Sequence, residues 1–209
     1  MKAKDLKQVR PGFHDPALGS QIVFRTALRA LSYPGRVQSM PAVTDLPLNG
    51  KAAAASLLLA LVDSECAVWI SPTLADTDAA AWLRFHTGCT WAKHFDSARF
   101  LWIAENDELP ELASLALGSD DYPDQSATVV VEVASLGDDT RVDALKLSLE
   151  GPGIALTQDV TVSGLPGDFV TQWAINHQAF PRGVDLFLAT SHEILGLPRS
   201  TRIHALQEA

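Results

Sequence analysis

The sequence is poor in cysteine, which limits the chemistry that the chain can support. It has two cysteines in 209 residues, Cys66 and Cys89, and they are far apart in the sequence. An iron–sulfur cluster is held by several cysteine thiolates close together, so the chain cannot hold one alone. A domain of this length also needs no disulfide to fold.

Long hydrophobic runs are missing as well. The longest apolar run, from Ala52 to Val62, is shorter than the roughly 20 residues that a helix needs to cross a bilayer. The first residues, MKAKDLKQVRPG, carry lysines but no apolar segment after them, unlike a signal peptide. The sequence therefore predicts a soluble protein with no membrane partner.

Positive charge is scarce. The chain has 16 Lys and Arg against 25 Asp and Glu, a formal net charge of -9, which argues against a nucleic-acid partner. The hydrophobic content of 47% is enough for a sizeable core. We expect a single domain over residues 1–209, with residues 1–12 as a flexible tail, because no linker or repeat divides the chain.

What the sequence does contain is an alternation of helical and extended patterns. Asp15-Pro16 is typical of a helix start, and Pro34-Gly35 of its end. Further helices are predicted over residues 52–63, 77–87, 109–117 and 168–177, and strands over 36–39, 66–70, 100–104 and 128–133. This order is typical of an α/β fold.

Two strand patterns stand out in the second half. Residues 144–149 and 154–162 alternate around Gly151-Pro152-Gly153, which predicts an antiparallel hairpin. Residues 184–189 are apolar on both faces, as in a central strand. We expect a mixed sheet of six to eight strands with helices on both faces.

Several motif fragments are incomplete. Gly151-Pro152-Gly153 lacks the third glycine and the following helix of a dinucleotide loop, and Gly50-Lys51 lacks the first glycine of a phosphate loop. His86, Cys89 and His94 have no regular zinc spacing, so no metal site is predicted. No Gly-x-Ser-x-Gly segment presents a nucleophilic serine. The residues alone therefore predict no complete catalytic site.

Three arginines near the C-terminus are the candidate ligand- or partner-binding residues: Arg182, Arg199 and Arg202. Arginine side chains beside a strand end can hold a carboxylate or phosphate with two hydrogen bonds. Pro198 predicts that Arg199 and Arg202 lie in an irregular tail past the last strand. The alternative is that all three pair with acidic residues of the same chain, as surface arginines commonly do.

Segments spread over most of the chain resemble one family. They are SQIVFRTALRALSYPGRV, CAVWISPTL, AAAWLRFHTGC, LSLEGPGI and FPRGVDLFLATSHEILGLPRSTRI. In order and spacing they resemble the PhnH family, the H subunits of the bacterial carbon–phosphorus lyase system. The resemblance implies a three-layer α/β/α sandwich with a mixed central sheet, similar to the large domain of pyridoxal-phosphate-dependent transferases but without the cofactor site.

The same resemblance implies a role in phosphonate catabolism. The chain would join the G, I and J subunits, or form a homodimer in isolation. With its partners it would be required to form α-D-ribose 1-methylphosphonate 5-triphosphate from a purine nucleoside triphosphate and an alkylphosphonate. Carbon–phosphorus cleavage would belong to the iron–sulfur J subunit. No cofactor, and no catalysis by this chain alone, is implied.

Two alternatives remain at this point. One is a phosphonate- or nucleotide-binding module without an assembly role, supported by the three arginines. The other is a pyridoxal-phosphate enzyme, which needs a lysine for the Schiff base. The candidates for that lysine are few: Lys2, Lys4, Lys7, Lys51, Lys93 and Lys146.

Overall fold

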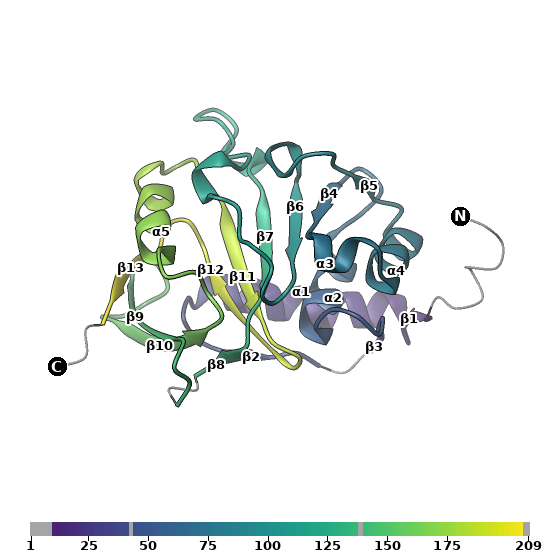
Figure 1. The fold of residues 1–209 in the computed structure, drawn as a ribbon, viewed down its shortest axis with the longest axis horizontal. Helices are drawn as coiled ribbons and strands as arrows, with labels where there is room; N and C mark the ends of the chain where they lie inside the picture. Colours follow the sequence, from purple (N-terminus) through teal and green to yellow (C-terminus); the bar gives the residue numbers. More distant parts are fainter. Residues whose placement is uncertain (1–9, 42–43, 138–139, 207–209) are drawn as a thin grey trace.

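The computed structural model describes residues 10–41, 44–137 and 140–206. Its centre is a seven-stranded sheet whose strands run across the middle of the molecule (Figure 1). The strands, in spatial order, are β2 (Gln38–Ser39), β12 (Glu193–Leu197), β11 (Asp185–Ala189), β7 (Thr128–Glu132), β6 (Phe100–Ile103), β4 (Ala67–Ile70) and β5 (Thr90–Trp91). The five strands from β11 to β5 are parallel, whereas β12 is antiparallel to both of its neighbours.

A second, smaller sheet is entirely antiparallel. Its order is β13 (Arg202–Ala205), β9 (Ala144–Glu150), β10 (Gln158–Ser163) and β8 (Ser135–Leu136). The predicted hairpin is confirmed as β9 and β10, with Gly151-Pro152-Gly153 in the turn between them. A third pair consists of β1 (Gly12–Phe13) and β3 (Thr44–Asp45). Most of the predicted tail, residues 1–9, lies outside the described residues, and Gly12 belongs to a strand instead.

Five helices accompany the sheets in the described part of the chain. They are α1 (Pro16–Ser32), α2 (Ala52–Leu61), α3 (Pro72–Ala75), α4 (Asp78–Thr87) and α5 (Phe169–Gln178). The predicted start of α1 is confirmed, because the Asp15 carboxylate accepts a hydrogen bond from Leu18 N at 3.0 Å. Likewise, α4 begins after Thr77 and ends at Gly88 in the left-handed conformation.

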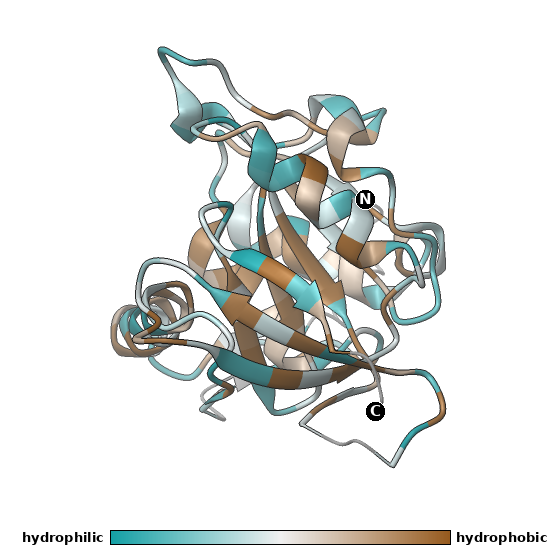
Figure 2. Ribbon diagram, turned by 90° about the vertical axis from the view of Figure 1, so that its left-hand side faces the viewer, coloured by the Kyte–Doolittle hydropathy of each residue, from teal (hydrophilic) through white to brown (hydrophobic). Residues whose placement is uncertain are grey.

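The alternation of side chains along the central strands divides the core in two. Trp102, Val130 and Phe187 face α1, α2 and α4. Their neighbours Leu101 and Val129 face the second sheet and α5. Accordingly, the strands at the centre of the molecule are mostly hydrophobic, while exposed loops carry more polar residues (Figure 2). The central strand predicted over residues 184–189 is β11, and Leu188 is fully buried in it.

The α/β class and the mixed sheet are confirmed, but one detail differs from the prediction. Helices alone cover only one face of the central sheet, because the other face is covered by the second sheet together with α5. The likeness to pyridoxal-phosphate-dependent transferases stays a prediction. No helix among the described residues has the length and apolar character of a membrane span.

The helix predicted over residues 109–117 is also wrong. Only Leu112–Ser114 forms a single 3₁₀ turn. The backbone carbonyls of Ala116 and Leu117 accept hydrogen bonds from the N–H groups of Ala127 and Gly183, at 2.7 and 2.9 Å. Leu115 is already extended, with φ of −81° and ψ of 170°, so the chain leaves the helical path directly after this turn and the tertiary contacts hold the residues that follow.

Candidate functional site

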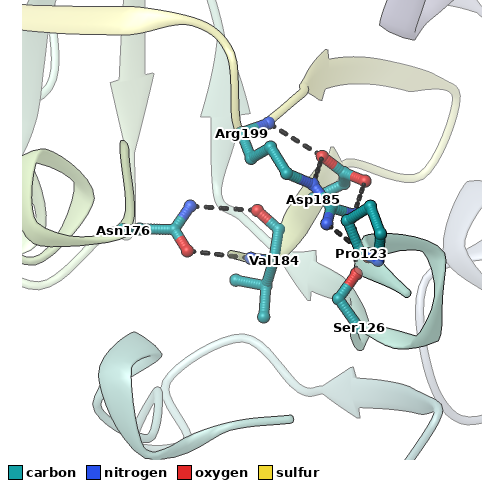
Figure 3. A network of polar contacts seen from close by, with 6 residues as sticks. All are labelled: Pro123, Ser126, Asn176, Val184, Asp185 and Arg199. Atoms are coloured by element: carbon teal, nitrogen blue, oxygen red, sulfur yellow. Dashed lines mark hydrogen bonds and ion pairs between the residues drawn. The ribbon is translucent and has the colours of Figure 1, made fainter. Parts of the chain in front are cut away.

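Arg199 joins three segments at the end of the central sheet where the parallel strands β7 and β11 begin (Figure 3). Its Nε lies 3.1 Å from Asp185 Oδ1, and its Nη2 lies 2.5 Å from Asp185 Oδ2. Its Nη1 donates to the Pro123 carbonyl at 2.7 Å, and Nη2 also donates to Ser126 Oγ at 2.6 Å. The side chain is 14% exposed. The guanidinium is therefore engaged within its own chain.

A second polar pair stands beside this network. The Asn176 amide donates to the Val184 carbonyl at 3.0 Å and accepts from Val184 N at 2.8 Å (Figure 3). Gly183, just before it, has a φ of 118°, and a Cβ there would lie 2.9 Å from Asn176 Oδ1. The buried amide fixes where α5 meets the start of β11, and glycine lets the backbone approach it.

Arg182 and Arg202 lie nearby but differ from Arg199 in their surroundings. Arg182 Nε is 3.2 Å from Asp120 Oδ1, in an exposed ion pair. Arg202 Nε is 3.3 Å from His177 Nε2, and His177 Nδ1 is 3.0 Å from the Arg199 carbonyl oxygen. These contacts gather the three predicted arginines around the C-terminal end of α5.

The predicted irregular tail after Pro198 is wrong. Arg202 opens strand β13 and stands opposite Glu150 of β9. Arg199 lies between β12 and β13 and is held by Asp185, which was the alternative considered for it. Strand β12 ends just before Pro198, but the chain then continues into β13 of the second sheet, which the local sequence pattern did not indicate.

The opposite end of the sheet, at the carboxyl ends of the parallel strands, holds a different set of residues. Glu132 ends β7 and is 4% exposed. Its Oε1 accepts hydrogen bonds from Lys51 N at 2.6 Å and from Trp102 Nε1 at 2.9 Å. Lys51 Nζ in turn lies 2.7 Å from Glu105 Oε2. In this way Glu132 holds the first turn of α2 against β6 and β7.

Burial raises the pKa of Glu132 above its ordinary value, although the hydrogen bonds from Lys51 and Trp102 work in the opposite direction. Glu132 is not among the candidate residues predicted from the sequence. A signal was present, because Glu132 interrupts the apolar run of residues 128–133, where a buried strand has little place for a charge.

Glu132 also lines a cleft of about 440 Å³ between the end of β7 and the N-terminal part of α5. In open α/β sheets, ligands bind outside the carboxyl ends of the strands. The cleft is acidic, since its other carboxylates come from Asp107, Glu108, Glu111 and Asp168. No lysine or arginine in the described part of the chain lines it. The cleft is therefore poorly suited to bind a phosphonate or triphosphate directly.

The described residues do not assemble a metal centre. They contain no group of three or more His, Cys, Asp and Glu side chains placed to hold a metal ion. His86 Nε2 lies 2.8 Å from the Arg10 carbonyl oxygen, which gives it a structural partner. Lys51 is engaged with Glu105, and the candidate residues Lys2, Lys4 and Lys7 lie outside the described residues.

Comparison with known proteins gives a consistent match over nearly the whole chain. The model of a family described as bacterial phosphonate metabolism protein (PhnH) matches residues 11–204. A Rhizobium meliloti (strain 1021) protein, named α-D-ribose 1-methylphosphonate 5-triphosphate synthase subunit PhnH, is 35% identical over 191 residues, which cover 91% of this chain and 93% of the relative. A Stutzerimonas stutzeri protein with the provisional name C-P lyase subunit protein HtxG is 36% identical over 186 residues, covering 88% and 85% of the two chains.

Proposed function

The chain belongs to the PhnH family of bacterial phosphonate metabolism proteins, and we propose that it is a subunit of the carbon–phosphorus lyase complex. One observation carries the proposal: two relatives that align with most of this chain are both named as subunits of larger enzymes. A location in the cytoplasm and partnership with the G, I and J subunits belong to the same proposal.

In the proposed reaction, an oxygen of the alkylphosphonate bonds to the ribose carbon that carries the purine, and the bond to the base breaks. The base leaves with the electron pair and takes up a proton. The product is α-D-ribose 1-methylphosphonate 5-triphosphate when the phosphonate is methylphosphonate. The chain contributes to this reaction as part of the assembly, and the support for this role is that both relatives are named as subunits.

Within this proposal, Arg182 and Arg202 are the arginines that can contact a partner or an anion. Both side chains are exposed and each has a single neighbouring side chain as its described contact. Arg199 is different, since its contacts with Asp185, Pro123 and Ser126 occupy most of its donors.

Co-purification tests the proposal. The tagged protein is isolated from cells that carry all the genes for phosphonate use, and the proteins bound to it are identified by mass. We expect the other lyase subunits in constant ratio. Isolation of the chain without them, from cells in which they are all expressed, would contradict the proposal.

A further inference from the structure

At one end of the central sheet, the second sheet and α5 do not cover the face that they cover elsewhere. These covering elements lie beside β11 and β12, whereas β4 and β5 lie at the far side of the molecule (Figure 1). At that far side Trp69 of β4 is half-buried and packs edge to face with Phe95, with ring centroids 6.0 Å apart. An apolar wall therefore reaches the surface there.

The wall belongs to a groove of about 530 Å³. Pro72 and Pro110 complete its apolar lining together with Trp69 and Phe95. Exposed apolar surface with a polar border is typical of a site that another molecule covers. Because the lining comes from three separate segments, the groove is part of the folded architecture and not a feature of one loop.

The border of the groove is negative. Asp107, Glu108 and Glu111 line it, and no lysine or arginine from the described part of the chain does so. Glu108 and Glu111 form no ion pair with any residue that the structure describes, and both are exposed. The groove thus offers carboxylates next to aromatic rings, and among the residues that the structure describes no lysine or arginine joins them in the lining.

Asp107 is held in place more firmly. It accepts hydrogen bonds from Thr73 N at 3.0 Å and from Thr73 Oγ1 at 2.5 Å. Burial works to raise the pKa of Asp107, but hydrogen bonds from Ser71 and Thr73 outweigh it and lower the pKa below its ordinary value. The carboxylate is therefore charged at neutral pH.

We propose that this groove is the docking site for an arginine- or lysine-bearing segment of a partner subunit. The inference rests on the proposed subunit function and adds the chemistry of the contact. A guanidinium can stack on the Trp69 and Phe95 rings while its N–H groups pair with the carboxylates at the border. Arginine and aromatic residues are the ones that most often dominate binding energy at protein interfaces.

Charge and shape favour a protein segment as the occupant over a small cation. A small cation would neutralise the border but leave the apolar wall of Trp69, Phe95 and the two prolines in water. A protein segment covers both parts at once. The net charge of -9 also attracts a basic partner from a distance, so association should weaken as salt rises.

Two variants test the groove. Glu108→Lys/Glu111→Lys reverses the charge of its border, and Ser114→Phe fills it without a change of charge. Ser114 is exposed, so the larger side chain should not disturb the fold. We expect each variant to bind the co-expressed lyase subunits about tenfold more weakly or worse, since loss of a central interface contact commonly has that effect. Thermal melting should stay close to that of the parent.

The matched control is Glu65→Lys/Asp121→Lys, which makes the same change of charge at exposed positions outside the groove. It should assemble like the parent. If the parent assembles and both groove variants do so with equal affinity, the inference is overturned while the subunit function stands. If the control weakens binding as much as the border variant, the effect is one of net charge, and the inference is overturned as well.

Failure of the parent itself to assemble would contradict the proposed function, and the docking site with it. The remaining possibility is that the groove binds a small ligand. Calorimetry with arginine amide, a small guanidinium probe, tests it. Micromolar binding of arginine amide, lost in Glu108→Lys/Glu111→Lys while subunit binding is unchanged, would assign the groove to a small ligand and overturn the inference. We expect no such binding.

Discussion

Among single side chains, Arg199 is the residue for which the structure changes the interpretation most. From the sequence it was one of three candidate arginines, with pairing to acidic residues of the same chain as the alternative. In the structure it is mostly buried, and two carboxylate oxygens, a carbonyl and a hydroxyl surround its guanidinium. No local pattern could show this, because Asp185 lies 14 positions away and Ser126 lies 73 positions away.

Substitution of Arg199 should therefore destabilise the protein. Removing one partner from a largely buried ion pair leaves the other charge uncompensated, so Arg199→Ala should lower the free energy of unfolding by about 3 kcal/mol. Arg202→Ala is the matched control, and its exposed side chain should change stability by no more than about 0.5 kcal/mol. Urea denaturation measures both. Equal stability of the two variants would show that the Asp185 contact does not support the fold.

The raised pKa of Glu132 predicts that the stability of the fold depends on pH. Its pKa is raised in the folded state, so the folded protein holds this proton more tightly than the unfolded chain does. The stabilisation is fully present below the unfolded pKa of Glu132 and is lost as pH rises through the folded pKa. In Glu132→Gln the amide oxygen can still accept from Lys51 N and Trp102 Nε1, but the titration is gone.

Glu132→Gln should consequently gain stability relative to the parent as pH rises from acidic to neutral values. Paired urea denaturation curves of parent and variant, measured across that range, give the difference directly. A difference that stays constant with pH would mean that Glu132 does not titrate with a raised pKa.

Among the helices and strands, those specified by local signals were the most predictable. The Asp15 cap, the Pro34-Gly35 end and the two-sided apolar pattern of residues 184–189 depend on neighbours in sequence, and the structure confirms all three. Residues 109–117 looked equally helical. There the chain makes a single turn at Leu112–Ser114 and its next residues bond to Ala127 and Gly183, distant partners that sequence periodicity does not reveal.

The central position of β11 has an energetic consequence. Leu188 is fully buried between β7 and β12. Leu188→Ala should reduce the free energy of unfolding by about 2–5 kcal/mol, the usual range for a buried leucine. Leu156→Ala is a suitable control, since its side chain is 86% exposed. A Leu188→Ala variant that unfolds at the same urea concentration as the parent would contradict this position of the strand.

For the molecule as a whole, the α/β class and the size of the central sheet could be predicted, but the second sheet could not. Strand β13 pairs with β9 although more than fifty residues separate them, and the sequence predicted an irregular tail where β13 lies. The candidate site escaped prediction for a related reason. Its residues come together only in the folded protein. Lys51 and Glu132, for example, share a hydrogen bond although 81 positions separate them in the sequence.

The isolated protein should form a homodimer. Leu18, Phe24 and Leu28 of α1 leave about half of their side-chain surface exposed, at 54%, 44% and 49%. Such exposed apolar residues on one helix favour burial against a second copy when no other subunit is present. Light scattering at micromolar concentration should give twice the mass of the chain, and a monomer mass would contradict this expectation.

The central claim is that this chain is a required subunit of the phosphonate-processing enzyme and does not catalyse the reaction alone. Release of adenine from ATP in the presence of methylphosphonate measures the reaction directly, using purified partner subunits with and without this chain. We expect adenine release only when the chain and its partners are combined. Adenine release by this chain alone, or an undiminished rate from the partners without it, would contradict the claim.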